Sequence, residues 1–148
     1  MKKFISVILI LAVSLICLSA CASYGRGDEV YTTYGGVYIT VDSIETGDSG
    51  AVINAVWHNE SENYISFGLW YTVEYLDGEE WKNVQITDFA IPEIACTLES
   101  GREGEQSYSL KYFNTIRPGT YRLRVEFYIP ELELGTQMTY ATFEVSYK

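Results

Sequence analysis

The residue types that most often do chemistry are sparse in this chain, and their spacing does not assemble a reaction centre. His58 is the only histidine, so sites with several imidazole ligands are excluded and at most one imidazole base is present. No Gly-x-Ser-x-Gly or Ser-x-x-Lys pattern, each typical of an activated serine, accompanies it. Because residues 58–63 form a polar stretch, we expect His58 in a surface loop. The sequence predicts no catalytic residue.

Two pairs of carboxylates fall where the sequence predicts turns or loops. Glu79 and Glu80 follow a hairpin signal, and Glu131 and Glu133 follow a proline. Glycosidases hold a spaced pair of carboxylates in a cleft, and nothing in the sequence indicates a cleft. We therefore assign both pairs to the charged surface.

Three more carboxylates, Asp42, Glu45 and Asp48, lie in one short stretch and could supply oxygen ligands to calcium. Their spacing does not match the EF-hand loop. The sequence has no Cys-x-x-Cys motif, no cluster of histidine with cysteine, and no glycine-rich loop of the kind that holds a phosphate. We expect neither a metal nor another cofactor.

The one covalent chemistry that the spacing does indicate is at Cys21. Lys2 and Lys3 precede an apolar run over residues 4–18, which is too short to span a membrane comfortably. Residues 18–21, Leu-Ser-Ala-Cys, resemble a lipobox, whose cysteine is diacylated on its thiol and becomes the new N-terminus after cleavage. We predict a signal peptide over residues 1–20 and a lipid anchor at Cys21 on the outer face of a bacterial cell membrane. Ordinary secretion, with a cut after Ala20 or Ala22, is the alternative.

Cysteine usage and charge narrow the possible partners. Cys17 leaves with the signal and Cys21 takes lipid, so Cys96 has no partner for an intrachain disulfide. Cys96 lies in the apolar run 94–98, where we expect a small buried side chain and not a reactive thiol. The formal charge of the whole chain is −10, and the basic residues that follow the signal are scattered. Nucleic acid is therefore excluded as a partner.

Any site must be positioned by strands, which the sequence indicates as short alternations of apolar and polar residues. One such strand, described next, organises the others. From Tyr121 to Ile129 every second side chain is apolar or aromatic, which predicts a strand with one buried face. The preceding order Pro118-Gly119-x-Tyr121 is that of the tyrosine corner in immunoglobulin-like sandwiches, where the phenol hydrogen-bonds to upstream backbone. We predict a structural corner at these three residues.

Similar alternations predict the remaining strands, and helical signals are weak. A bulge is expected near Asp42, because Ile44 is out of phase with Val41. Pro92 bars a central strand from residues 87–100, so we expect an edge segment that crosses between sheets. We predict an all-β, two-sheet antiparallel sandwich of seven to eight strands over residues 36–148, with a barrel as the alternative. Residues 21–35 would be the lipidated cysteine and a short tether, with a short first strand over residues 30–34 as the alternative. The strand ranges expected are 37–41, 51–57, 67–75, 80–86, 105–110, 120–129 and 138–147.

Two aromatic residues, Trp70 and Tyr128, fall on the outward phase of their strands. An exposed aromatic pair can stack on sugars or anchor a protein partner, so both are candidate ligand-binding residues. The alternative places Trp70 beneath the segment 87–100, or in the position that a core tryptophan occupies in sandwiches.

Several short motifs follow one another along the chain, at residues 59–61, 67–68, 71–74 and 77–78, Trp81, Val84, and residues 98–101 and 118–122. In this order and at these spacings they resemble a bacterial immunoglobulin-like domain family found in exported proteins, over roughly residues 36–128. Antibody domains carry two bridging cysteines that this chain lacks. Leu123 stands where the second would be, two residues after Tyr121, so apolar packing should replace the bridge. The resemblance implies a sandwich at the cell surface and brings no catalytic residues with it.

These observations favour a non-catalytic binding module that contacts a protein or a cell-wall polymer. A protease-inhibitor-like or chaperone-like accessory factor is the alternative, in which residues 87–100 or the His58 loop occupy a groove of an exported partner.

Overall fold

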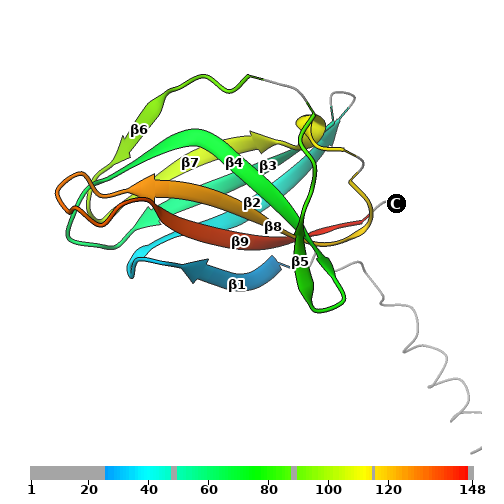
Figure 1. Ribbon diagram of the computed structural model, residues 1–148, viewed down its shortest axis with the longest axis horizontal. Helices are drawn as coiled ribbons and strands as arrows, with labels where there is room; N and C mark the ends of the chain where they lie inside the picture. Colours follow the sequence, from blue (N-terminus) through cyan, green and yellow to red (C-terminus); the bar gives the residue numbers. More distant parts are fainter. Residues whose placement is uncertain (1–25, 48–49, 88–89, 115, 147–148) are drawn as a thin grey trace, which may run out of the picture.

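Two antiparallel sheets pack face to face in the computed structural model, which describes residues 26–47, 50–87, 90–114 and 116–146 (Figure 1). The larger sheet, sheet A, has the order β1-β9-β8-β4-β5, and β6 also pairs with β4. The smaller sheet, sheet B, has the order β2-β3-β7. This arrangement confirms the predicted all-β sandwich. The strands are β1 (Arg26–Thr32), β2 (Val37–Gly47), β3 (Gly50–Asn59), β4 (Ile65–Asp77), β5 (Glu80–Asn83), β6 (Ala95–Leu98), β7 (Arg102–Ser109), β8 (Gly119–Tyr128) and β9 (Gln137–Val145), with a 3₁₀ helix η2 at Leu110–Tyr112.

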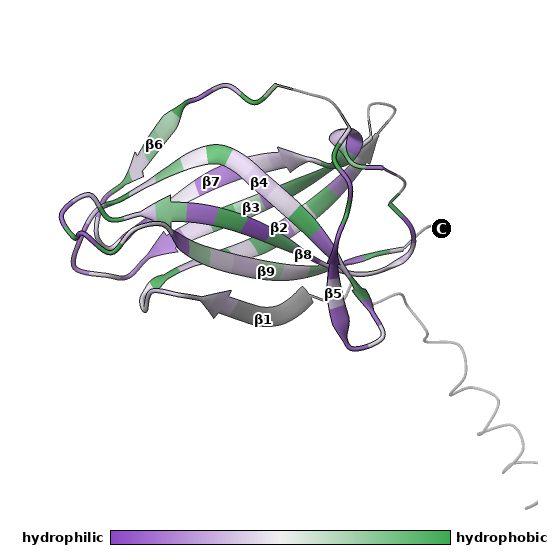
Figure 2. Cartoon of the chain, in the orientation of Figure 1, coloured by the Kyte–Doolittle hydropathy of each residue, from purple (hydrophilic) through white to green (hydrophobic). Residues whose placement is uncertain are grey.

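The core lies between the sheets and is built by the alternation read from the sequence. The inward side chains of β8, from Tyr121 through Phe127, and Ile129 beyond it are all buried. Figure 2 shows hydrophobic and hydrophilic positions alternating along this strand. Each fully buried aliphatic or aromatic side chain contributes about 1.5–3 kcal/mol, so such a core can hold two sheets without a disulfide.

Trp57 is the largest fully buried side chain, and it joins the two sheets. Its ring stacks on Phe67 of β4 at 4.4 Å between centroids and meets Phe127 edge-on at 6.0 Å. Its indole N–H donates to the Tyr108 hydroxyl at 3.0 Å, so the polar atom is satisfied inside the core. The core tryptophan therefore comes from β3, and the expectation that Trp70 might fill that position is wrong.

Register shifts in β2 and β4 adjust these strands. Between β2 and β3 the register shifts between Val41 and Ser43, as the sequence predicts. Between β4 and β8 it shifts from Phe67↔Phe127 to Tyr71↔Val125, so β4 advances four residues while β8 advances two. The extra residues of β4 leave the regular ladder, and they include Trp70.

A strand lies within residues 21–35, for which the sequence predicts a tether, with a short strand over residues 30–34 as the alternative. Residues 26–32 form this strand, β1, which pairs with β9 through Val30↔Ala141, Tyr31↔Tyr140 and Thr32↔Thr139. An edge strand can be held by backbone hydrogen bonds without a run of apolar side chains, so composition did not distinguish it from a tether. The sandwich therefore begins before residue 36.

The segment between β5 and β6 also differs from expectation. It contains no regular strand around Pro92, as predicted, but it returns to the β4 edge of sheet A as β6. The chain passes to sheet B only after Leu98, through a turn in which Gly101 has φ +70°.

Candidate ligand-binding site

Trp70 and Tyr128 line the same pocket, which has a volume of about 540 Å³. We call this pocket the aromatic slot. Trp70 is 51% exposed and Tyr128 is 47% exposed. The residues that line the aromatic slot are Phe67, Gly68, Leu69, Trp70, Ile91, Pro92, Glu93, Ile94, Ala95 and Tyr128.

Local backbone geometry brings the two aromatic residues together. Tyr128 is the last residue of β8 and pairs with Ser66 of β4, while Trp70 lies in the β4 bulge that follows. Phe67 and Ile65 point into the core, so Ser66 and Gly68 point to the outer face with Tyr128. Because Trp70 is about half exposed, the alternative that it is buried beneath residues 87–100 is wrong.

Small residues form the floor between the aromatic walls. Gly68 of β4 pairs with Ala95 of β6, so their positions on the outer face carry at most a methyl group. Ile94, which is 51% exposed, lies beside Gly68, with its carbonyl oxygen 3.7 Å from the place a Cβ of residue 68 would occupy. The slot is thus a shallow hollow with ring-bearing walls and an apolar rim at Ile94.

Three polar side-chain groups of the slot have no partner within the described part of the chain. The Trp70 indole N–H, the Tyr128 hydroxyl and the exposed Glu93 carboxylate make no hydrogen bond there. Together they offer one donor, one group that both donates and accepts, and one acceptor. Among the described residues, no lysine or arginine lines the slot. Such a site suits binding, because it presents free ring faces and free polar tips without a nucleophile and base in contact.

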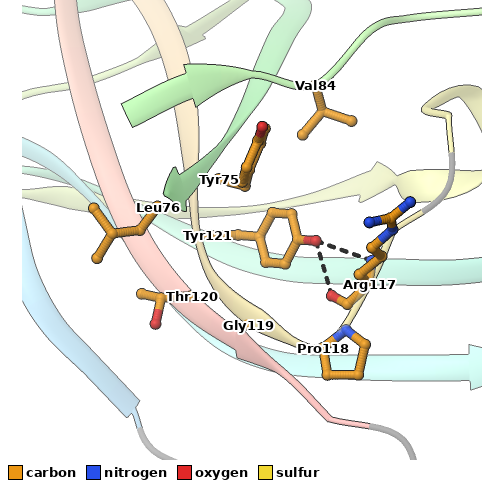
Figure 3. Close-up of a pocket in the computed structure, with 8 residues that line it drawn as sticks. All are labelled: Tyr75, Leu76, Val84, Arg117, Pro118, Gly119, Thr120 and Tyr121. Atoms are coloured by element: carbon orange, nitrogen blue, oxygen red, sulfur yellow. Dashed lines mark hydrogen bonds between the residues drawn. The ribbon is translucent and has the colours of Figure 1, made fainter. Parts of the chain in front are cut away.

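A second pocket, of about 430 Å³, lies at the other end of sheet A, against the predicted corner (Figure 3). The Tyr121 hydroxyl donates to the carbonyl of Arg117 at 2.8 Å and accepts from the N–H of Arg117 at 3.0 Å. Gly119 has φ +152°, a conformation that other residues rarely adopt. The Tyr121 hydroxyl is therefore used to hold the loop before β8, which is the structural corner predicted at Pro118, Gly119 and Tyr121.

His58 lies in β3 and not in a loop, which corrects the prediction. On the outer face of sheet B its Nε2 lies 2.9 Å from the Thr40 hydroxyl and its Nδ1 lies 2.9 Å from the Glu103 carboxylate. This row has the order of groups found in hydrolase triads. It lies across three strands, its Glu103 side chain is 70% exposed, and neither pocket described above includes it.

Tyr38 completes this cluster by stacking on the His58 ring at 4.6 Å between centroids. Its hydroxyl donates to Glu60 at 2.7 Å, and this hydrogen bond to a carboxylate raises the pKa of Tyr38. The cluster joins β2, β3 and β7 through side chains. The cluster thus links side chains of neighbouring strands on the polar face of sheet B.

The remaining acidic candidates are dispersed. Within the residues described, no group of three or more His, Cys, Asp or Glu is placed to hold a metal ion. Glu45 accepts a hydrogen bond from Asn54, and Asp48 lies outside the described residues. Glu79 is in the β4–β5 turn, but Glu80 begins β5. Glu131 and Glu133 are exposed in the β8–β9 loop, and Cys96 is a half-buried free thiol in β6.

The predicted signal peptide and Cys21 fall outside the described residues. Among those that are described, no helix has the length and apolar composition needed to cross a membrane.

The architecture now defines a class. Two facing antiparallel sheets, a core tryptophan and a tyrosine corner are features of immunoglobulin-like sandwiches.

The model of the bacterial Ig-like domain family matches residues 34–144, so the chain belongs to that family. This confirms the resemblance read from the sequence. A search of the curated proteins found no match. Membership in this family suggests a binding or interaction module.

Proposed function

We propose that this protein is a lipid-anchored, non-catalytic binding module on the outer face of a bacterial cell membrane, and that it contacts its partner through the aromatic slot. The observation that carries the proposal is the convergence of Trp70, Tyr128 and Ile94 on one pocket. Seven large hydrophobic residues among those described are exposed, and three of them line this slot. Concentrated exposed aromatics of this kind mark contact sites.

The anchor is supported by the sequence around Cys21. Charged Lys2 and Lys3, the apolar run and the Leu-Ser-Ala-Cys tetrapeptide together favour acylation. Two or more acyl chains give stable attachment where one is marginal, because each buried CH₂ contributes about 0.8 kcal/mol.

The direction in which the slot faces is consistent with such an anchor. Arg26, at the start of β1, pairs with Phe143, and Phe143 pairs with Tyr121. The chain therefore enters sheet A at the corner end. Tyr128 stands at the opposite end of β8, about 23 Å away at roughly 3.3 Å per residue. A domain tethered through its N-terminus would hold the slot away from the bilayer, where a partner can reach it.

A second candidate function is an inhibitor-like or chaperone-like accessory factor. The observation that favours it is the exposed Ile94 beside Pro92, in a segment that could enter a groove of an exported partner. His58 itself is held in β3, so within the predicted His58 loop only the residues after Asn59 lie outside the strands and could contact such a groove.

Retention of the full-length lipidated protein, held in detergent, on immobilised cell-wall polymers and detergent-solubilised membrane proteins tests the proposal, because the detergent removes retention by the lipid anchor. Trp70→Ala and Tyr128→Ala should each reduce retention, because each removes one wall of the slot. Tyr31→Ala is the matched control, since Tyr31 is 62% exposed and lies on β1, outside the slot. Equal retention of all three variants and the wild type would show that the slot is not the contact surface.

A further inference from the structure

We infer that the aromatic slot binds a neutral glycan and seats a pyranose ring between Trp70 and Tyr128. This inference rests on the proposed function and names its ligand class. The two rings make no ring contact with each other in the described structure, and about half of each side chain is exposed. Aromatic faces that remain open across a small-residue floor suit the C–H faces of a sugar ring, which are flat and apolar.

The free polar groups match hydroxyls better than they match an apolar anchor. An inserted hydrophobic side chain would bury the Trp70 N–H, the Tyr128 hydroxyl and the Glu93 carboxylate without partners, which is costly. The hydroxyls of a sugar can accept from the indole, exchange hydrogen bonds with the phenol and donate to the carboxylate. A hydroxylated ring therefore satisfies every group that the slot presents.

The negative charge of the slot and of the whole chain favours a neutral glycan over an anionic one. Among the described residues that line the slot, Glu93 is the only charged one, and the whole chain carries a formal charge of −10. A phosphate- or carboxylate-bearing polymer would meet a negative group with no neighbouring cation, so it would be repelled. Because no ion pair forms with a neutral ligand, its affinity should change little with salt concentration.

Calorimetric titration of the full-length lipidated protein, held in a detergent without sugar headgroups, tests this inference. The neutral probes are linear β-1,4-linked oligosaccharides of glucose and of N-acetylglucosamine, and the anionic probe is a linear oligosaccharide of glucuronic acid. We expect the wild type to bind a neutral probe more tightly than the anionic one. Trp70→Ala and Tyr128→Ala should each weaken binding about tenfold, as expected for loss of a stacking ring.

Three further variants separate stacking from folding. Trp70→Phe keeps a ring and should retain most of the affinity, Glu93→Gln should weaken binding to a neutral probe, and Tyr31→Ala should have no effect. The inference is overturned if neither neutral probe binds, if the anionic probe binds more tightly, or if Tyr31→Ala loses as much affinity as Trp70→Ala. Slot-dependent retention on cell fractions without binding of a neutral probe would end the glycan inference and leave the binding module intact. If retention on cell fractions does not depend on the slot and no neutral probe binds, both the glycan inference and the proposed binding module are contradicted.

Discussion

The hydroxyl of Tyr121 and the backbone of Arg117 are joined by two hydrogen bonds, one in each direction, at 2.8 and 3.0 Å. They fix the loop that leads into β8, the strand on which the core of sheet A depends. Their position at the N-terminal end of β8 separates them from the slot at its other end.

Tyr121→Phe should therefore lower the free energy of unfolding by about 1–3 kcal/mol, because two backbone groups lose their partner. Tyr75→Phe is the matched control, since Tyr75 also contributes its ring to this region but its hydroxyl makes no hydrogen bond within the described residues. Urea denaturation measures both. A cost of Tyr121→Phe no larger than that of Tyr75→Phe would contradict a stabilising corner.

A second prediction concerns Arg122, whose guanidinium lies between the rings of Trp81, at 4.5 Å, and Tyr140, at 4.4 Å. Its Nε–H donates to Glu74, whose side chain is only 11% exposed. Arg122→Met should lower the free energy of unfolding by about 2–4 kcal/mol, because it leaves a largely buried carboxylate uncompensated.

Lys82→Met removes an ion pair with Asp77 in which both groups are largely exposed, so it should change stability little. Denaturation at low and high salt distinguishes the two pairs. The prediction fails if both substitutions have the same small effect, or if high salt abolishes the contribution of Arg122.

Alkaline pH should destabilise the fold through its buried tyrosines. Burial raises the pKa of Tyr71 to about 12, and it also raises the pKa of Tyr108. An unfolded tyrosine has a pKa of about 10, so the unfolded state loses its proton first. The stability from Tyr71 is present in full below about pH 10 and is lost as the pH rises towards 12.

Tyr71→Phe should consequently make stability fall less steeply between about pH 10 and 12. Tyr31→Phe changes an exposed tyrosine and should leave the profile as it is. Thermal unfolding across this pH range gives the comparison. Identical profiles for wild type and Tyr71→Phe would show that Tyr71 is not a source of the alkaline loss.

The sequence predicted the core because the alternation of apolar and polar residues indicates which face of a strand is buried, as in β8. It also placed Trp70 and Tyr128 on the outer face. It could not predict that Ile94 lies at the rim of the slot, because the segment around Ile94 has no periodicity and its position depends on where β6 pairs. It did not decide between a first strand and a tether at residues 30–34, because pairing of an edge strand uses backbone groups common to every residue. It placed His58 in a loop because the outer face of sheet B is itself polar, and a polar strand end resembles a loop in composition.

The lipid anchor is the remaining prediction, and it depends on a single thiol. Because a lipobox cysteine carries its acyl chains on sulfur, a serine at that position removes the acceptor while changing the side chain by one atom. Cells grown with radiolabelled palmitate should label the wild-type protein and not Cys21→Ser, and the variant should lose its stable attachment to membranes.

Cys96→Ser supplies the control, since Cys96 is a free thiol in β6 and no part of the lipobox. It should keep the label and the membrane attachment. Equal labelling of Cys21→Ser and wild type, or loss of the label in Cys96→Ser alone, would mean that the chain is not anchored at Cys21. If neither the wild type nor Cys21→Ser were labelled, the slot would belong to a domain released after secretion, whose partner need not lie near the membrane.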